Sequence, residues 1–246
     1  MALAGSRLAV HWATIAVIVA VALGALAVGS APAERDPAST RGPGRARTCA
    51  NGPVALTFDD GPSDANSKRL AAILAEERVQ ATFFMTGRSV AARPGRARSL
   101  ARGDHRIYHH TYDHAALTSL SDAGIRRQIR RSQRAFARAR VAGGRLLRPP
   151  YGKVNKRVRA TVRAMGFRTV LWTVDTHDWD ASRTPRQIIR SVMRRLESGA
   201  VILLHDKEDS QATMAALPRL IRRIRRRGYC FGVLDRRGRV VLPDGA

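Results

Sequence analysis

The sequence predicts an α/β fold with parallel strands, in one domain that begins near residue 49. Short apolar runs typical of buried strands alternate with longer segments of helical periodicity. Polar residues directly follow several of the apolar runs, and barrel enzymes place their reactive groups at the carboxyl ends of parallel strands. Alternation of this kind fits either an open sheet or a closed barrel.

The individual elements follow from local patterns. Apolar or β-branched runs predict strands at 54–56, 169–174, 200–202 and 229–234. Leu70, Ile73 and Leu74 recur at helical spacing and predict a helix over 66–77. A second helix is predicted over 121–139, where Ser121 suits the N-cap. Further helices are predicted over 155–165, 185–196 and 213–227.

The segment Thr57-Phe58-Asp59-Asp60-Gly61-Pro62 places two carboxylates at the end of the first strand. The chain bends at Gly-Pro, so both carboxylates can reach one pocket even though strand side chains alternate. Two carboxylates in one pocket repel, and such a pair is normally accompanied by a proton or a cation. The plainer interpretation is a solvated Asp-Gly turn, which is the commoner use of such dipeptides.

Three of the seven histidines fall within 109–114. His110 and His114 are four residues apart and can face one ion from a helix or a turn. Two neutral imidazoles and one carboxylate make the three-ligand set of catalytic zinc sites, which leaves a position open for water. Zinc is the default ion for such a set, and cobalt, nickel and manganese also fit.

Three more polar segments follow apolar runs. They are Arg148-Pro149-Pro150-Tyr151-Gly152, Asp175-Thr176-His177-Asp178-Trp179 and Leu203-Leu204-His205-Asp206. Each also has a purely structural interpretation. Taken alone, His205 is better explained as a core histidine and Trp172 as a core aromatic, and Arg148 is one of 40 arginines.

The order of these segments resembles the polysaccharide deacetylases of carbohydrate esterase family four. The motifs TFDDGP, HxxxH, RPPYG, DxxDW and LLHD all occur in the family's order, and 81–87 resembles the family's second strand. The resemblance implies a distorted, incomplete (β/α) barrel and a metal-dependent removal of acetyl groups from an N-acetylated sugar polymer. The chain departs from the family just before His110, where Arg106, Tyr108 and His109 replace the usual Glu, Gly and Asn.

The resemblance implies a metal centre with an acid and a base. Asp60, His110 and His114 are implied as metal ligands. Asp59 is implied as the general base that takes a proton from the metal-bound water, and His205 as the general acid for the departing amine. An alternative assignment uses Asp59 as a fourth ligand.

Supporting roles also follow from the resemblance. Arg148 is implied to support Asp59, Asp178 to orient His205, and the backbone N–H of Tyr151 to bind the oxyanion. Trp179 and Leu203 are implied as walls of the slot for the acetyl methyl group. No role follows for three further residues of these segments, Asp175, His109 and His177.

The first 48 residues predict export. Residues 8–33 contain no Asp, Glu, Lys or Arg, and Ala31-Pro32-Ala33 is typical of a signal-peptide cleavage site. The stretch is also long enough to span a bilayer, which takes ~20 residues. We therefore expect 1–33 to be a signal peptide or a transmembrane anchor, 34–48 a flexible linker, and 49–246 a secreted or anchored extracytoplasmic catalytic domain.

The two cysteines fit an exported protein. Cys49 precedes the first predicted strand and Cys230 lies in the last one. If the barrel brings its last strand beside its first, the two residues become neighbours. We therefore predict a disulfide, which an oxidising compartment favours.

The net charge of +25 admits two explanations. Basic segments at 125–131 and 219–227 suit an anionic wall polymer or membrane surface. The plainer explanation is GC-rich codon usage, because the chain has 40 arginines and only four lysines. Nucleic acid is not expected as a partner, since no binding motif is present and few aromatics are available for stacking.

The sequence is compatible with three functions. The leading one is a metal-dependent N-deacetylase that acts, as a monomer, on peptidoglycan or another N-acetylglucosamine polymer. The second is an O-acetyl esterase on acetylated xylan-like glycans, since only the leaving atom differs. The third is a non-catalytic glycan- or polyanion-binding module, against which the presence of every implied catalytic residue argues.

Overall fold

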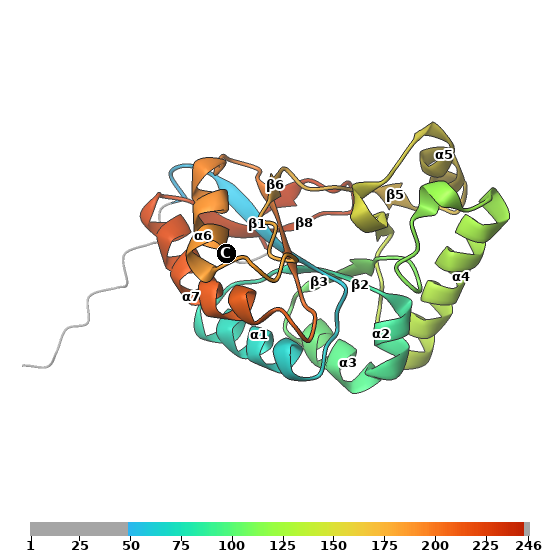
Figure 1. Ribbon diagram of the computed structural model, residues 1–246, viewed down its shortest axis with the longest axis horizontal. Coiled ribbons are helices and arrows are strands. Elements are labelled where there is room, and N and C mark those ends of the chain that lie inside the picture. The colour runs from blue at the N-terminus through green and yellow to red at the C-terminus, as the bar shows by residue number, and fades with distance from the viewer. Residues whose placement is uncertain (1–48, 244–246) are drawn as a thin grey trace, which may run out of the picture. The chain divides into compact units, whose positions relative to one another are not determined.

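The computed structural model of the protein describes residues 49–243 (Figure 1). The predicted signal or anchor segment 1–33 and linker 34–48 lie outside the described residues. The described residues form one α/β domain. No helix within 49–243 has the length and hydrophobicity needed to cross a membrane.

Within 49–243, a sheet of nine strands forms the centre of the domain. The main path runs β5-β4-β3-β2-β1-β7-β6 and all its neighbours are parallel. β8 runs parallel to the first half of β1, and β9 pairs antiparallel with β8. The strands are β1 (Pro53–Asp59), β2 (Thr82–Met85), β3 (Arg106–His109), β4 (Leu146–Leu147), β5 (Arg168–Thr169), β6 (Val174–Asp175), β7 (Val201–His205), β8 (Cys230–Leu234) and β9 (Val240–Val241).

The curled sheet is an incomplete barrel, as the resemblance implies, because β5 and β6 end the path without pairing with each other. The prediction of a single strand over 169–174 is wrong, because β5 ends at Thr169 and β6 begins at Val174. The N–H of Val170 donates to Leu147 at one edge of the sheet, whereas the N–H of Thr173 donates to Val201 at the other. Residues 170–173 therefore cross from one edge of the sheet to the other and form a continuous β-ladder with neither edge.

Helices flank the sheet along an arc from α6 through α1 to α5 (Figure 1). The five predicted helices are present with ends shifted by at most two residues, and the Ser121 hydroxyl accepts from Gly124 N–H as an N-cap. α2 and α3 were not predicted, because Pro94 and several arginines interrupt their apolar periodicity. The helices are α1 (Ala65–Glu76), α2 (Gly87–Ala92), α3 (Pro94–Arg102), α4 (Asp122–Ala139), α5 (Lys156–Ala164), α6 (Pro185–Arg194) and α7 (Gln211–Arg226).

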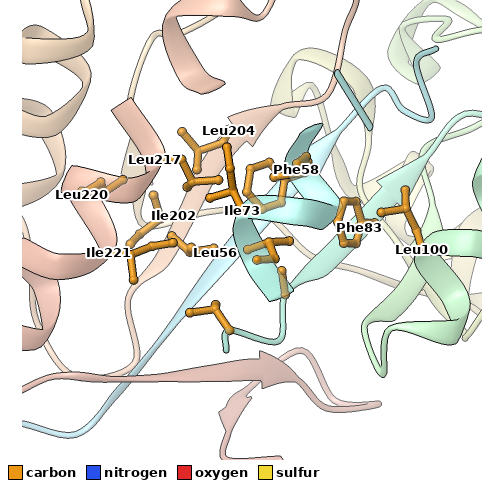
Figure 2. Close-up of a cluster of buried hydrophobic side chains, with 14 of the residues drawn as sticks. Leu56, Phe58, Ile73, Phe83, Leu100, Ile202, Leu204, Leu217, Leu220 and Ile221 are labelled. Atoms are coloured by element: carbon orange, nitrogen blue, oxygen red, sulfur yellow. The ribbon is translucent and has the colours of Figure 1, made fainter. Parts of the chain in front are cut away.

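The main core lies between the sheet and the helices that cover it (Figure 2). Leu56 and Phe58 of β1 belong to this core, together with Leu217 of α7. Because side chains alternate along a strand, Thr57 and Asp59 face the opposite side of the sheet, inside its curve. The apolar pattern of β1 thus determines where its terminal carboxylate points.

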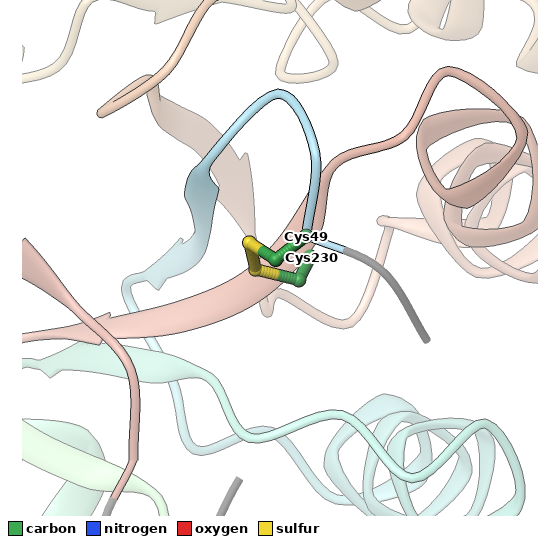
Figure 3. Close-up of a disulfide and its surroundings, with 2 residues drawn as sticks. All are labelled: Cys49 and Cys230. Atoms are coloured by element: carbon green, nitrogen blue, oxygen red, sulfur yellow. A yellow bond between two sulfur atoms is a disulfide. The ribbon is translucent and has the colours of Figure 1, made fainter. Parts of the chain in front are cut away.

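A disulfide joins Cys49 to Cys230, with their Cα atoms 5.1 Å apart (Figure 3). The reason is the pairing of β8 with β1, which places Pro53 opposite Cys230. The predicted neighbourhood of the first and last long strands is therefore present. The bond lies at the start of β1, whereas the aspartate motif lies at its end.

Candidate active site

A cavity of about 430 Å³ opens at the carboxyl ends of β1, β3, β4, β6 and β7. Most residues that the motifs singled out meet there. Its walls are formed by Asp59, Asp60, His110, His114, Tyr151, Trp172, Asp175, Trp179, Leu203, His205 and Lys207. Arg148 and Asp178 are buried behind this wall, where they contact Asp59 and His205 respectively.

Asp60, His110 and His114 form a group of three side chains that could hold a metal ion. Oδ1 of Asp60 lies 3.4 Å from Nε2 of His110 and 3.3 Å from Nε2 of His114. Ligand atoms bound tetrahedrally at about 2.0–2.2 Å from an ion are separated by roughly 3.3–3.6 Å. The donor spacing therefore fits a small divalent cation.

Two further observations support a cation at this place. Oδ1 of Asp60 is buried without a hydrogen-bond partner, which is costly unless something else satisfies it. Burial lowers the pKa of His110 to about 3, although the charge of Asp60 opposes this, so the ring is neutral. Its Nδ1 donates to the Arg148 carbonyl at 2.7 Å, and the lone pair of Nε2 is left facing Asp60.

The backbone of the site is held in uncommon conformations. Asp60 has φ of 75°, His114 of 63° and Tyr151 of 61°. Non-glycine residues adopt such left-handed values rarely, and they cluster where the surrounding structure fixes them for a function. Turn geometry, instead of a helix, is what brings His110 and His114 to one point.

Asp59 and Arg148 form a buried ion pair on one side of the cavity. Nη1 of Arg148 lies 2.8 Å from Oδ1 of Asp59 and also donates to Thr57 Oγ1 at 2.8 Å, while Nη2 donates to the Leu171 carbonyl at 3.0 Å. Burial raises the pKa of Asp59 above its ordinary value, and the charge of Arg148 opposes that rise. Since Arg148 holds Oδ1, the second oxygen remains directed toward His110, 3.8 Å away.

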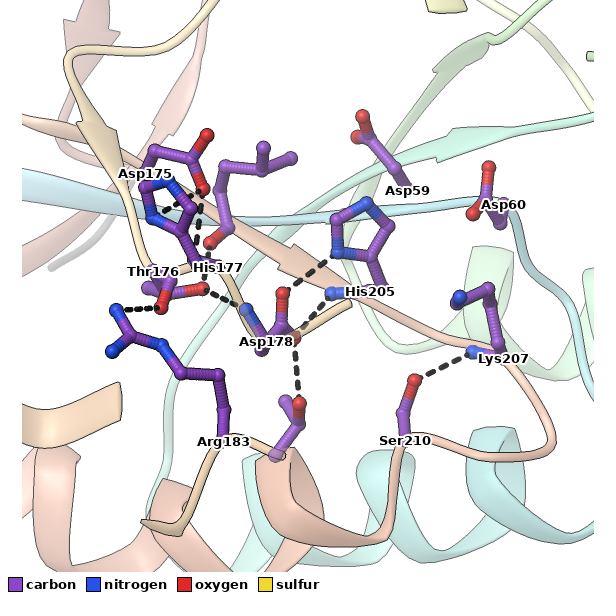
Figure 4. A network of polar contacts seen from close by, with 12 residues as sticks. Asp59, Asp60, Asp175, Thr176, His177, Asp178, Arg183, His205, Lys207 and Ser210 are labelled. Atoms are coloured by element: carbon purple, nitrogen blue, oxygen red, sulfur yellow. Dashed lines mark hydrogen bonds and ion pairs between the residues drawn. The ribbon is translucent and has the colours of Figure 1, made fainter. Parts of the chain in front are cut away.

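His205 and Asp178 form a second pair, and Figure 4 shows the His205 ring between Asp178 and Asp59. Nδ1 of His205 lies 2.7 Å from Oδ1 of Asp178, and the His205 backbone N–H donates to Oδ2 at 2.9 Å. Burial alone would lower the pKa of His205, but the hydrogen bond and charge of Asp178 outweigh it and raise the pKa. The imidazole is thus biased toward its protonated form.

Aromatic and apolar side chains complete the cavity. Trp179 and Tyr151 are more than half exposed at 54% and 62%, and Leu203 is buried at the wall. The expectation that Trp172 lies within a strand is wrong, because 170–173 is not a strand. Its indole packs against the buried cluster that contains Ala55 and Phe84, as expected of a core aromatic, and it also lines the cavity. Gly152 approaches it so closely that a Cβ there would lie 2.9 Å from Cη2 of the indole.

Sequence reasoning also missed Lys207 as a wall residue, although it directly follows LLHD and is one of only four lysines. The histidines without an assigned role lie outside the metal group. His109 is buried with Nδ1 2.8 Å from Ser132 Oγ, and His105 accepts from Ala81 N–H. His177 is exposed, with Nδ1 3.5 Å from Asp175.

Known proteins with similar sequences and structures identify the family of the chain. The family model described as polysaccharide deacetylase matches residues 46–170. A peptidoglycan-N-acetylglucosamine deacetylase from Bacillus cereus is 33% identical over 181 residues, which cover 72% of this chain and 84% of that protein. A protein of the same description from Listeria monocytogenes is 33% identical over 199 residues, which cover 81% of this chain. The chain spans only 41% of the length of that second relative.

A solved structure shares the fold. The family 4 carbohydrate esterase from Streptomyces lividans, in complex with acetate, superimposes with a TM-score of 0.73 and is 36% identical. The match covers 79% of this chain and 99% of that one. The resemblance in the motifs is thereby confirmed, and the chain belongs to the polysaccharide deacetylase family, carbohydrate esterase family four.

Proposed function

We propose that this protein is a metal-dependent deacetylase that hydrolyses the N-acetyl group of N-acetylglucosamine residues in a polymer such as peptidoglycan. One observation carries the proposal: the group Asp60, His110 and His114 borders the same cavity as a buried Asp–Arg pair and a His–Asp pair. The Bacillus and Listeria relatives, both described as peptidoglycan-N-acetylglucosamine deacetylases, support the substrate class.

Asp60, His110 and His114 would hold the ion, for which zinc is the default choice. When bound, a divalent ion of this kind polarises the acetyl carbonyl and lowers the pKa of water from 15.7 to about 7. Asp59 is kept out of the ligand set in this proposal, because Arg148 already holds one of its oxygens. The other oxygen is free to accept a proton.

Asp59 acts as the general base. Its buried position raises its pKa, which makes the carboxylate a better proton acceptor than an exposed aspartate. Arg148 provides the opposite charge that keeps Asp59 ionised and fixes its orientation through a 2.8 Å contact. The attacking water loses its proton to Oδ2 of Asp59.

His205 acts as the general acid. The Nδ1–H group donates to Asp178, so the proton to be delivered is the one on Nε2. The raised pKa, caused by the hydrogen bond and charge of Asp178, favours the protonated ring until the carbon–nitrogen bond breaks. The proton then goes to the sugar nitrogen, which leaves as a neutral amine, and acetate is released.

The cavity wall suits an acetylated sugar. Leu203 and the two tryptophans supply an apolar surface for the acetyl methyl group. The backbone N–H of Tyr151 is proposed as a donor to the carbonyl oxygen, where negative charge develops. The exposed rings of Tyr151 and Trp179 are available to pack against sugar faces at the rim.

Acetate release from three substrates tests the proposal, using the full-length chain reconstituted with Zn²⁺. Peptidoglycan and N-acetylated chitooligosaccharide are expected to release acetate, and acetyl-xylan much less. Preferential release from acetyl-xylan would instead favour the O-acetyl esterase, and release from none would favour a binding module. Asp59→Asn and a chelator should each abolish the activity, and activity that survives either contradicts the mechanism.

The export of the domain and its attraction to an anionic wall polymer or membrane surface remain proposals from the sequence. They rest on residues 1–48, which lie outside the described residues, and on the net charge of +25. Fractionation of cells that express the full chain tests the first, and salt-sensitive binding to isolated walls or anionic vesicles tests the second.

A further inference from the structure

Asp206 is a buried carboxylate that takes no part in the proposed chemistry. It directly follows His205 at the end of β7 and is 1% exposed. Its Oδ1 accepts from Ser63 Oγ at 2.8 Å, and its Oδ2 accepts from Ser67 Oγ at 2.5 Å. Ser63 lies between Asp60 and α1, and Ser67 lies in the first turn of α1, so the carboxylate connects β7 to both.

The backbone makes the same connection. Asp59 and His205 are paired in the parallel ladder of β1 and β7, and the N–H of Asp206 donates to the Asp59 carbonyl at 2.9 Å. Gly61 packs against the side chain of Asp206, because a Cβ at Gly61 would lie 2.4 Å from Oδ2. Asp206 therefore contacts the turn on both sides of Asp60.

This turn needs external support. Asp60 is held at a φ of 75°, which an aspartate leaves readily unless its neighbours fix it. On the β2 side, Thr86 supplies such contacts through its N–H to the Gly61 carbonyl and its hydroxyl to the Asp60 carbonyl. On the β7 side, the contacts come from Asp206.

The chemistry of these contacts indicates that Asp206 fixes the geometry of the turn and does not merely fill space in the core. A buried carboxylate is costly to desolvate, and an apolar residue of similar size would stabilise a core at less cost. The two serines also bond each other's backbones, since Ser63 N–H donates to Ser67 Oγ and Ser67 N–H to Ser63 Oγ. The result is a closed polar network with Asp206 as its acceptor, and such networks fix geometry more narrowly than apolar packing does.

We propose that Asp206 is a positioning residue that holds the turn carrying Asp59 and Asp60 in register with His205. The inference rests on the proposed function of the site. Through this contact, one strand end sets the distance between the proton donor on β7 and the metal ligand and proton acceptor on β1. Asp206 belongs neither to the metal group nor to the residues that line the catalytic cavity.

The test compares Asp206→Ala and Ser67→Ala with a matched control, Glu77→Gln. Glu77 caps the far end of α1 and binds Arg222 and Arg225 of α7 at 2.9 and 2.8 Å. Glu77 is a largely buried carboxylate that links α1 to the C-terminal part of the chain, as Asp206 does. It lies ~15 Å along the helix from Ser67, the residue of α1 that Asp206 contacts. Its loss therefore reproduces a purely structural effect.

The measurements are the dissociation constant for Zn²⁺ alone, the melting temperature of the metal-free protein, and kcat and KM on chitooligosaccharide at saturating Zn²⁺. Asp206→Ala should weaken Zn²⁺ binding by roughly 10–100-fold, as loss of a supporting contact does at other metal sites. It should also lower kcat more than it raises KM. Ser67→Ala should produce smaller losses of the same kind, and Glu77→Gln should change Zn²⁺ affinity by less than about twofold.

Each outcome decides the inference. Wild-type Zn²⁺ affinity and kcat in Asp206→Ala overturn it, and so do equal losses in Glu77→Gln. If Asp206→Ala does not fold, Ser67→Ala decides, since it retains the carboxylate and removes one donor. A wild-type protein that binds Zn²⁺ but releases no acetate contradicts the proposed function, while the affinity comparison still tests Asp206.

Discussion

Nδ1 of His205 lies 2.7 Å from Oδ1 of Asp178, and the backbone N–H of the same histidine donates to Oδ2 at 2.9 Å. Thr213 donates to Oδ2 as well, at 2.6 Å. The carboxylate is therefore fixed through both oxygens, and it fixes the imidazole in turn. Burial alone would raise the pKa of Asp178, but the hydrogen bond and charge of His205 hold it below its ordinary value.

Replacement of Asp178 by Asn should shift the alkaline limb of the pH profile. The pKa of His205 is raised in the folded protein by Asp178, so its proton persists to a higher pH than on a free imidazole and is lost as the pH rises through the raised pKa. Without the charge of Asp178 the pKa falls, and the rate should begin to decline at a lower pH. We also expect a loss in kcat of roughly 10²-fold or more. The shift of the limb and the loss in rate are both measured by recording kcat and kcat/KM as functions of pH.

Thr213→Val is the control for this experiment. It removes one hydrogen bond to Asp178 and leaves the charge that acts on His205, so the alkaline limb should move little. An alkaline limb that stays in place in Asp178→Asn would show that His205 is not the group that titrates. The linked stability has the same sign: the stabilisation from the His205–Asp178 pair is complete below about pH 6.5 and is lost above the raised pKa.

Replacement of Arg148 by Met should destabilise the protein as well as inactivate it. Arg148 is fully buried, and its removal leaves Asp59 as a buried charge without its partner. Breaking a buried pair in this way costs about 3–5 kcal/mol in the free energy of unfolding, measured by urea denaturation. The same change removes the charge that opposes the rise in the pKa of Asp59, so the carboxylate becomes harder to ionise and less of the base is in its active form.

The double variant Asp59→Asn/Arg148→Met separates the two effects. It removes the unpaired charge and should recover most of the lost stability, while activity stays absent because the base is gone. If Arg148→Met and the double variant have equal free energies of unfolding, the loss in Arg148→Met comes from packing and not from the unpaired charge of Asp59.

The sequence was sufficient for the parts of the site that depend on local pattern. Alternation along β1 places Asp59 opposite the helix-covered face, and short motifs place His110, His114 and His205 at strand ends. The prediction of a single strand over 169–174 failed at 170–173, because distant pairing partners decide whether a β-branched run forms one strand. Here the chain hydrogen-bonds to β4 at Val170 and to β7 at Thr173. Between these points, the Leu171 carbonyl is free to accept from Arg148, and Trp172 faces the cavity.

The departures before His110 show a second limit of local reasoning. Tyr108 and His109 are bulkier than the family's usual residues, and both are buried. Two glycines far along the chain make room for them. A Cβ at Gly144 would lie 2.3 Å from Tyr108, and one at Gly143 would lie 2.5 Å from His109. The small residues at 143–144 thus accommodate the two bulky side chains of β3, and no pattern near His110 reveals this.

Metal binding should stabilise the folded protein measurably. An ion that binds only the folded state at 100 times its dissociation constant adds about 2.7 kcal/mol. For a domain of this size that corresponds to a rise in melting temperature of roughly 5–10 °C. The shift is measured by thermal denaturation with Zn²⁺ and with a chelator, and His114→Ala should abolish it. A full shift in His114→Ala would place the ion elsewhere.

The double variant Cys49→Ser/Cys230→Ser should lose stability and keep its chemistry. The disulfide joins residues 181 positions apart in the sequence. Its removal is expected to cost about 2–5 kcal/mol in the free energy of unfolding, which lowers the melting temperature by roughly 4–20 °C. The bond lies at the start of β1 and the reacting groups lie ~20 Å away at its other end. Well below the melting temperature, kcat and Zn²⁺ affinity should therefore match the wild type. A loss of either under those conditions would mean that the β1–β8 pairing controls the active-site end of the strand.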